Sequence, residues 1–245
     1  MSVSAQACWG VLPAAGIGSR MASELPKQYL QVAGATLMEH SLRALLGCAD
    51  LTAVVVALHA ADSRADALAV FDDPRVQRVT GGAQRSDSVL AALDAVLQQA
   101  APEDWVLVHD AARPCVRVTD IDRLITSVRA SGTGGILAEP IVDTVKQAGA
   151  QALVQRTLDR SGLWRAQTPQ MFRLGELYQA LLLARSRNQP VTDEASAMEM
   201  AGYPVQLVAG PARNLKVTLP ADLQLAGWYL GGGADAQPGS EQQCE

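Results

Sequence analysis

The chain has 245 residues, enough for one large α/β domain or two small ones. Its apolar fraction of 49% supports a large core, and an aromatic fraction of only 4% predicts that Ala, Val and Leu build that core. A formal net charge of −5 argues against a basic nucleic-acid-binding surface as the main function. No apolar run approaches the ~20 residues that span a bilayer, so we expect neither a membrane nor a nucleic acid as partner.

The start of the chain and its cysteines indicate a cytoplasmic protein. Residues 1–7 lack the basic start and the long apolar stretch of a signal peptide. Cys8, Cys48, Cys115 and Cys244 are widely spaced and form no CxxC pair. A disulfide framework or a zinc site is therefore not expected.

Strand and helix patterns alternate along the first half of the chain. Short apolar runs without polar alternation predict buried strands at residues 8–12, 53–58, 105–108 and 135–138. Apolar residues at helical spacing predict helices at residues 37–46, 89–97 and 121–128. Thr119 and Asp120 are candidate caps of the third helix. This alternation implies βαβ units and a parallel sheet.

The second half begins with a polar stretch, residues 141–172, of alternating character. We interpret it as an excursion from the sheet in the form of a hairpin arm. We expect one domain over residues 1–230, which includes this arm. The Gly, Gln and Ser-rich residues 231–245 are expected to form a disordered tail. Further elements are predicted as helices at residues 174–187 and 193–200, a strand at 205–209 and a helix at 221–230.

The strongest chemical signal follows the first strand. Residues 12–21 read Leu-Pro-Ala-Ala-Gly-Ile-Gly-Ser-Arg-Met, and residues 26–30 read Pro-Lys-Gln-Tyr-Leu. A loop of small residues lets backbone N–H groups approach a phosphate chain, and Arg20 and Lys27 add positive charge. Met21 stands where a dinucleotide fingerprint needs its third glycine, and no P-loop run occurs. A bare GxG would favour a tight strand-exit turn, but the two cations favour phosphate binding.

Four further motifs follow in order, at residues 81–88 (with Gly81-Gly82, Arg85 and Ser88), 108–114 (VHDAARP), 192–196 (TDEAS) and 214–218 (NLKVT). With the first segment, they resemble the family of 2-C-methyl-D-erythritol 4-phosphate cytidylyltransferases over about residues 8–230. The resemblance implies a Rossmann-like α/β fold: a mostly parallel sheet with helices on both faces and a protruding β-arm used for dimerisation. It also implies transfer of a cytidylyl group from CTP to a polyol phosphate in non-mevalonate isoprenoid synthesis, with release of pyrophosphate.

The resemblance assigns roles to the matching residues. Arg20, Lys27 and Lys216 are expected to surround the triphosphate with positive charge, because this transfer depends mostly on positioning and electrostatic stabilisation. The residues expected to bind CTP are Pro13, Ala14, Ala15, Gly16, Gly18, Gly82, Arg85 and Ser88. The residues expected to bind the acceptor are Asp110, Arg113, Thr144, Arg160, Thr168 and Thr192. Of these, Thr144, Arg160 and Thr168 are expected to come from the neighbouring subunit of a homodimer.

Several of these residues also have a purely structural interpretation. Ser86 could cap a helix after the Gly81-Gly82 turn. Lys216, taken alone, reads as a solvated strand-edge lysine. Asp110 follows a buried strand, where ligands of open α/β sheets gather. It could hold the Mg²⁺, or another divalent cation, that we expect as cofactor, orient the acceptor, or cap the next turn. His109 is interpreted as an oriented core residue rather than a catalytic base.

Two rival functions remain open at this stage. A relative with the same motifs could act on another polyol phosphate, such as ribitol 5-phosphate, and only the acceptor-binding residues would distinguish it. A non-catalytic nucleotide-binding regulator on the same fold should have lost Lys27 or Lys216, and both are present. Ala83 stands where some relatives carry an acidic residue, so any side-chain contact there differs in this chain.

Overall fold

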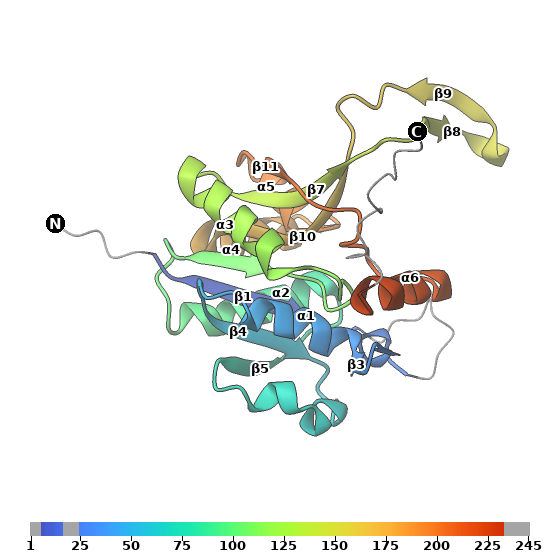
Figure 1. The fold of residues 1–245 in the computed structure, drawn as a ribbon. Helices are drawn as coiled ribbons and strands as arrows, with labels where there is room; N and C mark the ends of the chain where they lie inside the picture. Colours follow the sequence, from blue (N-terminus) through green and yellow to red (C-terminus); the bar gives the residue numbers. More distant parts are fainter. Residues whose placement is uncertain (1–5, 17–24, 233–245) are drawn as a thin grey trace, which may run out of the picture.

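A seven-stranded sheet with the strand order β11-β7-β10-β6-β1-β4-β5 forms the centre of the molecule (Figure 1). The computed structural model describes residues 6–16 and 25–232. The strands of this sheet are β1 (Cys8–Pro13), β4 (Leu51–Leu58), β5 (Val76–Thr80), β6 (Trp105–Val108), β7 (Gly135–Pro140), β10 (Trp164–Arg173) and β11 (Gln206–Ala209). Two small sheets pair β2 (Gln31–Val32) with β3 (Ala35–Thr36) and β8 (Val145–Ala148) with β9 (Val154–Leu158).

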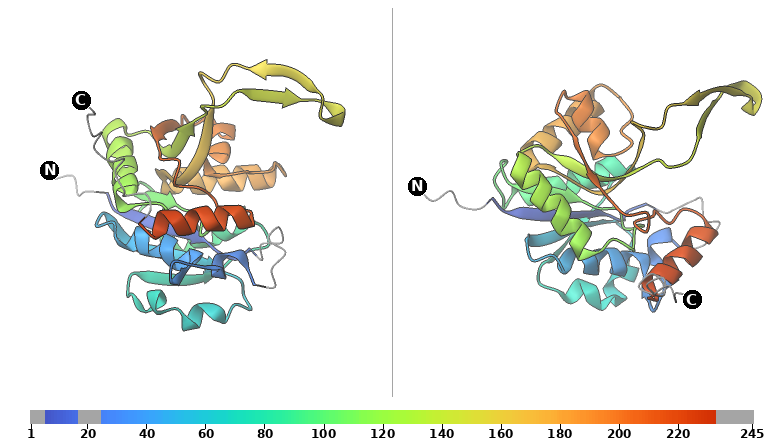
Figure 2. Two further views of the ribbon diagram at one scale, coloured as in Figure 1. Left: turned by 45° about the vertical axis from the view of Figure 1, so that its right-hand side comes forward. Right: turned by 45° about the horizontal axis from the view of Figure 1, so that its top comes forward.

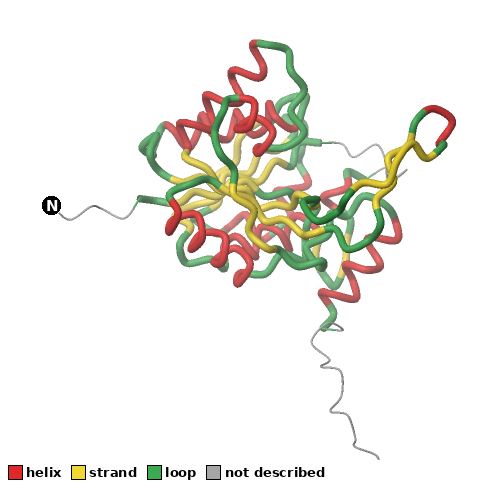
Figure 3. Tube along the Cα trace, turned by 90° about the horizontal axis from the view of Figure 1, so that it is seen from above, coloured by secondary structure: helices red, strands yellow, loops and turns green. Residues whose placement is uncertain are grey.

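Helices cover both faces of the central sheet, as Figures 2 and 3 show. The α-helices are α1 (Leu37–Leu46), α2 (Arg85–Leu97), α3 (Val118–Ser131), α4 (Leu174–Ser186), α5 (Glu194–Met200) and α6 (Pro220–Leu230). Short 3₁₀ turns are η2 (Lys27–Tyr29), η3 (Arg64–Ala67), η4 (Ala69–Asp72) and η5 (Ala150–Ala152). No helix in the described ranges is long and apolar enough to cross a membrane.

Both faces of the central strands are buried, which explains their apolar runs. In β1, Leu12 packs into the cluster beneath α1 and α3, whereas Trp9 and Val11 pack into the cluster beneath α2 and α4. Leu42 of α1 and Leu93 of α2 are fully buried in these two clusters. A strand covered on both faces needs apolar residues at successive positions, so it lacks the usual alternation.

Parallel pairing places the loops that follow β1 and β6 at one edge of the sheet. β1 is parallel to both β4 and β6, with Val11 opposite Val108. The backbone N–H of His109 then donates to the carbonyl of Val11 over 2.9 Å. The residues that follow these two strands therefore emerge side by side, which is where ligands bind in open α/β sheets.

The structure confirms the predicted α/β class but corrects several boundaries. β5 was not predicted, because polar Gln77 and Arg78 interrupt its short apolar run. Helix α3 begins at Val118, so Thr119 is not its cap, and Asp120 lies in its first turn, accepting from the backbone N–H of Arg117 over 3.2 Å. Ser86 lies inside α2, which Gln84 precedes as the cap. Acidic side chains therefore stabilise these helix starts from inside the first turn.

The predicted arm is present but shorter than expected. β8 and β9 pair antiparallel and project from the body as a hairpin (Figure 1). The expected end at residue 172 is wrong, because β10 pairs antiparallel with both β6 and β7 inside the central sheet. Its register shifts between Ala166 and Gln170, and this irregularity places polar residues among buried ones. Because β10 contains these polar residues, its sequence resembled that of the arm although it is a core strand. Dimerisation through the hairpin stays a prediction.

Candidate active site

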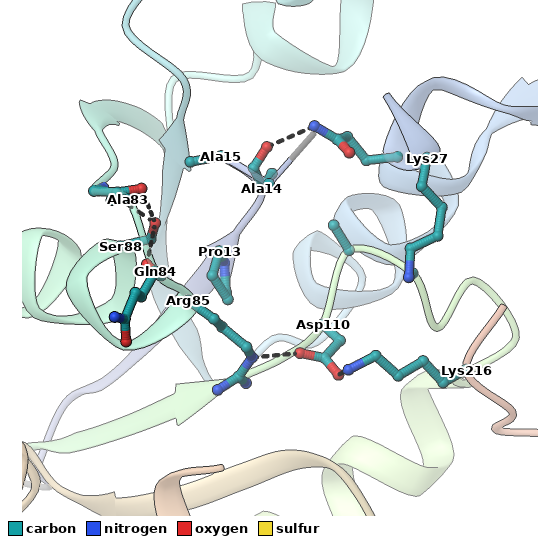
Figure 4. Close-up of a pocket in the computed structure, with 15 residues that line it drawn as sticks. Pro13, Ala14, Ala15, Lys27, Ala83, Gln84, Arg85, Ser88, Asp110 and Lys216 are labelled. Atoms are coloured by element: carbon teal, nitrogen blue, oxygen red, sulfur yellow. Dashed lines mark hydrogen bonds and ion pairs between the residues drawn. The ribbon is translucent and has the colours of Figure 1, made fainter. Parts of the chain in front are cut away.

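A cavity of about 270 Å³ opens at the carboxyl edge of the sheet (Figure 4). Its walls come from the loop after β1, from η2, from the start of α2, from the loop after β6 and from Lys216. We call it the nucleotide cavity. The residues that line it are Pro13, Ala14, Ala15, Gly16, Lys27, Gln28, Gly82, Ala83, Gln84, Arg85, Ser88, Asp110, Ala111, Ala112 and Lys216.

The structure brings together all predicted CTP-binding residues that it describes. They line the nucleotide cavity together with two of the predicted catalytic cations, Lys27 and Lys216. Gly18 and Arg20, the other residues of that prediction, lie outside the described residues. The motifs at residues 81–88 and 214–218 thus reach one cavity from distant parts of the chain.

Close contacts between small residues shape the nucleotide cavity. A Cβ atom added at Gly81 would lie 2.5 Å from the Cβ of Ala15, so a larger residue would push the two loops apart. The Ser88 hydroxyl accepts from the Gly82 N–H over 3.2 Å. Gln28 donates to the Ala14 carbonyl over 2.7 Å, which ties η2 to the first loop. Ser88 and Gln28 therefore hold the backbone that lines the cavity.

A second cavity of about 270 Å³ adjoins the first, and we call it the acceptor cavity. Arg85, Asp110 and Lys216 line both cavities and form their common wall. The other residues that line the acceptor cavity are Arg113, Ala166, Gln167, Thr168, Gln170, Thr192 and Asp193. Three predicted acceptor-binding residues, Arg113, Thr168 and Thr192, are therefore here beside Asp110. The expectation that Thr168 comes from the neighbouring subunit is wrong, because its hydroxyl accepts from the Asp110 N–H of its own chain.

Thr144 and Arg160 are not brought to this cavity. Both lie in the exposed connections of the hairpin, and Arg160 donates to the backbone carbonyl of Val142. Neither is among the residues that line the two cavities. A contact with the acceptor would thus require the hairpin of a second copy.

The carboxylate of Asp110 is the centre of the common wall. Its Oδ1 accepts from Arg85 Nε over 2.9 Å, and its Oδ2 lies 2.8 Å from Lys216 Nζ (Figure 4). Arg113 Nε lies 3.8 Å from Oδ2. Burial raises the pKa of Asp110, but the charges of Arg85 and Lys216 outweigh burial and hold this pKa well below its usual range. Asp110 is therefore a carboxylate at physiological pH.

Arg85 is held between two carboxylates. Its Nη1 and Nη2 donate to the two oxygens of Glu194 over 2.6 and 2.9 Å, while Nε donates to Asp110. Glu194 begins α5 and is fully buried. These bonds orient Arg85 toward Asp110 rather than leaving the guanidinium free for a phosphate. The TDEAS motif pointed to this segment, but no sequence feature paired Glu194 with Arg85 across 109 positions.

The side chain of Thr168 holds the backbone of Asp110 in place. Its hydroxyl accepts from the Asp110 N–H over 3.0 Å and lies 3.0 Å from His109 Nδ1. His109 Nε2 lies 3.2 Å from the Arg113 carbonyl. These contacts match an imidazole that is protonated on Nε2 and accepts from Thr168 on Nδ1. The Thr168 hydroxyl therefore positions Asp110, and His109 is an oriented core residue.

Asn214 lines neither cavity but bonds to residues of the acceptor cavity, and it was missed despite its place in the NLKVT motif. It is fully buried, and its Nδ2 donates to the Thr168 carbonyl over 2.8 Å and to Gln167 Oε1 over 3.2 Å. The backbone carbonyl of Asn214 accepts from Arg113 Nη1 over 2.6 Å. Asn214 thus fixes the segment that carries Lys216 against the acceptor cavity.

Comparisons with known proteins identify the family. The family model described as 2-C-methyl-D-erythritol 4-phosphate cytidylyltransferase matches residues 8–232. Proteins of that name from Pseudomonas putida (strain W619) and Ectopseudomonas mendocina (strain ymp) are 51% and 52% identical. These matches cover 89% and 88% of this chain and 93% and 92% of the relatives. The crystal structure of the Francisella tularensis protein of that name is 36% identical, with a TM-score of 0.78 over 91% of this chain and 99% of that chain.

The buried imidazole predicts how stability depends on pH. Burial lowers the pKa of His109 from 6.5 to about 4. Between these values the unfolded chain binds a proton that the folded chain does not, so stability is complete above pH 6.5 and falls as the pH drops toward 4. Urea unfolding should show that the wild type loses about 2 kcal/mol more than His109→Gln between pH 7.5 and about pH 5. An equal loss in both proteins would contradict this role of His109.

Proposed function

The chain belongs to the 2-C-methyl-D-erythritol 4-phosphate cytidylyltransferase family, and we propose that it catalyses the reaction of that name. The cytidylyl group of CTP is transferred to 2-C-methyl-D-erythritol 4-phosphate, which releases pyrophosphate and forms 4-diphosphocytidyl-2-C-methyl-D-erythritol for non-mevalonate isoprenoid synthesis. The observation that carries this proposal is the common wall of Arg85, Asp110 and Lys216 between two adjoining cavities. One cavity can hold a nucleotide while the other presents an acceptor to it.

The reaction needs little more than positioning and charge. An oxygen of the acceptor phosphate attacks the α-phosphorus, and the bond from that phosphorus to the pyrophosphate oxygen breaks. The attacking phosphate is already ionised, so no side chain has to remove a proton. Both reactants are anions whose repulsion must be neutralised. Lys27 and Lys216 face the nucleotide cavity, and Arg113 lines the acceptor cavity, so cations surround the place where the two phosphates meet.

Asp110 prepares Lys216 for this task. The Lys216 side chain remains 41% exposed although its ammonium group lies against Asp110. It can therefore move to a phosphate oxygen without a rearrangement of the buried residues. Because Asp110 holds the ammonium group at the common wall, only a short movement brings it to a phosphate, so the ion pair favours catalysis.

The shape of the nucleotide cavity supports a preference for cytosine. Ala14, Ala15 and Gly82 present backbone groups and small side chains, and the close approach of Gly81 to Ala15 narrows the space. A pyrimidine fits such a space better than a purine does, and backbone groups can read its edge. The side chain at Ala83 is a methyl group, so any hydrogen bond at this position is made by the backbone.

We also propose that Mg²⁺, or another divalent cation, accompanies the triphosphate. No group of three His, Cys, Asp or Glu side chains in the described part of the chain is arranged to hold a metal ion. Asp110 offers a single carboxylate, and departure of Lys216 to a phosphate would free its Oδ2. This donor set fits an ion carried on the phosphates, since Mg²⁺ keeps several waters and needs only one or two carboxylates. Bound there, Mg²⁺ would neutralise phosphate charge.

A homodimer is the proposed assembly, with the hairpin reaching the acceptor cavity of its partner. The hairpin exposes Val142, Leu153 and Val154 by 72%, 66% and 62% of their surface. A two-stranded ribbon with exposed apolar side chains gains stability by packing on another surface. Such packing would also bring Thr144 and Arg160 to a cavity that they do not line in their own chain. We place this enzyme in the cytoplasm, where CTP is made.

Substrate specificity tests the reaction itself. Pyrophosphate release should be measured with CTP, UTP, ATP and GTP against 2-C-methyl-D-erythritol 4-phosphate and ribitol 5-phosphate. We expect rapid release only with CTP and the erythritol phosphate, and loss of that release when EDTA removes divalent cations. Equal turnover with a purine nucleotide would contradict the cytosine pocket, and a preference for ribitol 5-phosphate would contradict the proposed acceptor.

Substitution tests the two lysines of the nucleotide cavity. Lys27→Ala and Lys216→Ala should each lower kcat/KM by on the order of a hundredfold, because each removes a charge that stabilises the transition state. Arg43→Ala removes a cation that pairs with Glu39 on α1, away from both cavities, and serves as the control. Steady-state kinetics that find near-normal activity in either lysine variant would exclude that lysine from the mechanism.

The homodimer predicts complementation between two inactive chains. An Arg160→Ala chain and a Lys27→Ala chain should each be inactive, but a mixed dimer contains one site with both residues intact. Random reassociation makes about half of the dimers mixed, so roughly a quarter of wild-type activity should return. No recovery despite heterodimers seen by native mass spectrometry would place Arg160 outside the partner's site.

A further inference from the structure

Glu194 is a buried carboxylate that contacts the common wall at Arg85. Neither cavity is lined by Glu194, yet both of its oxygens accept from Arg85, which lines both cavities. A buried ion pair is a weak source of stability, because desolvation offsets the attraction between its charges. The pair between Glu194 and Arg85 therefore calls for a role other than holding the fold together.

The donors of Arg85 are divided between its two partners. Two of its nitrogens donate to Glu194, and only Nε donates to Asp110, at Oδ1. The Oδ2 atom of Asp110 is thereby left to Lys216, 2.8 Å away (Figure 4). A guanidinium beside a single carboxylate prefers a two-point pair. Without the charge of Glu194, Arg85 would turn onto Asp110 and compete with Lys216 for Oδ2.

We propose that Glu194 is a positioning residue of the transfer reaction, which restrains Arg85 so that Asp110 can hold Lys216 at the junction of the two cavities. The charges support this arrangement. Glu194 balances Arg85, and the negative charge of Asp110 then acts on Lys216. The importance of this arrangement for catalysis rests on the proposed function, whereas the arrangement itself is a property of the empty protein.

The start of α5 is built as a fixed support for Glu194. The Asp193 carboxylate accepts from the Ser196 N–H over 3.0 Å and from Gln170 Nε2 over 2.9 Å. Gln170 Oε1 accepts from the Ala195 N–H over 2.9 Å. Gln170 lies in β10 opposite Val108, the last residue of β6 before His109 and Asp110. The support of Glu194 is thus joined to β6, the strand that precedes Asp110.

Lysine labelling of the substrate-free protein tests this inference. The sequence contains three lysines, Lys27, Lys146 and Lys216, so acetylation by a low dose of acetic anhydride can be assigned by peptide mass spectrometry. Release from Asp110 should make Lys216 more reactive. In Glu194→Gln, labelling of Lys216 relative to Lys146 should rise by roughly fivefold, as for loss of one ion pair. An unchanged ratio in the folded variant would overturn the proposal.

Two further variants separate positioning from folding. Glu39→Gln alters a buried carboxylate that also lies in the first turn of a helix and pairs with an arginine, at 2.8 Å, and it should leave the ratio unchanged. The double variant Arg85→Gln/Glu194→Gln removes both charges, so no guanidinium competes for Asp110 and the ratio should return to that of the wild type. The proposal would be contradicted if Lys216 of the double variant were labelled as fast as in Glu194→Gln. If Glu194→Gln does not fold, labelling of Lys216 in the double variant that is faster than in the wild type would contradict it.

Kinetics connect the arrangement to the reaction. Glu194→Gln should lower kcat/KM for CTP by about tenfold, as loss of an oriented charge does, whereas Glu39→Gln should not. Labelling needs no substrate, so failure of the role of Glu194 can be distinguished from failure of the proposed function. A protein without cytidylyltransferase activity but with the expected labelling pattern would refute the proposed function alone. An active protein with unchanged labelling would refute only the role of Glu194.

Discussion

The site depends on one shared carboxylate. Asp110 follows β6 at the carboxyl edge of the sheet, and its two oxygens bind Arg85 and Lys216 separately. Because Asp110 is buried, these ion pairs act where water screens them little. Each surrounding element contributes to the arrangement: Thr168 of β10 holds the backbone of Asp110, and Glu194 of α5 holds Arg85. The wall between the cavities is therefore set before any substrate binds.

This arrangement suits a reaction between two anions. A cavity with unrestrained cations would bind phosphates in many ways, whereas paired cations offer their charge in one geometry. Lys216 belongs to the second kind, since its ammonium group lies on Asp110 while its side chain stays partly exposed. Asn214 ties the same segment to Thr168. The nucleotide and acceptor sides of the wall are thus parts of one hydrogen-bonded network.

What the sequence could predict follows from how far apart the interacting residues lie. Strands such as β6 were predictable because burial on both faces requires an apolar run. β10 was not, because its shifted register buries the polar residues Gln167, Thr168 and Gln170. The motifs identified the cavity residues, since small residues and lysines have a recognisable use near phosphates. The pairing of Arg85 with Glu194 joins helices far apart in the chain, and only the folded structure reveals such a contact.

A crystal structure with both substrates would show where Lys216 and the acceptor phosphate lie when both cavities are filled. It should contain 2-C-methyl-D-erythritol 4-phosphate and a CTP analogue with a methylene group between the α and β phosphorus atoms, which cannot release pyrophosphate. We expect that Lys216 Nζ has moved from Asp110 to an α-phosphate oxygen, and that the acceptor phosphate lies beside Arg113 across the common wall. A triphosphate bound elsewhere, with Lys216 still paired to Asp110, would contradict it.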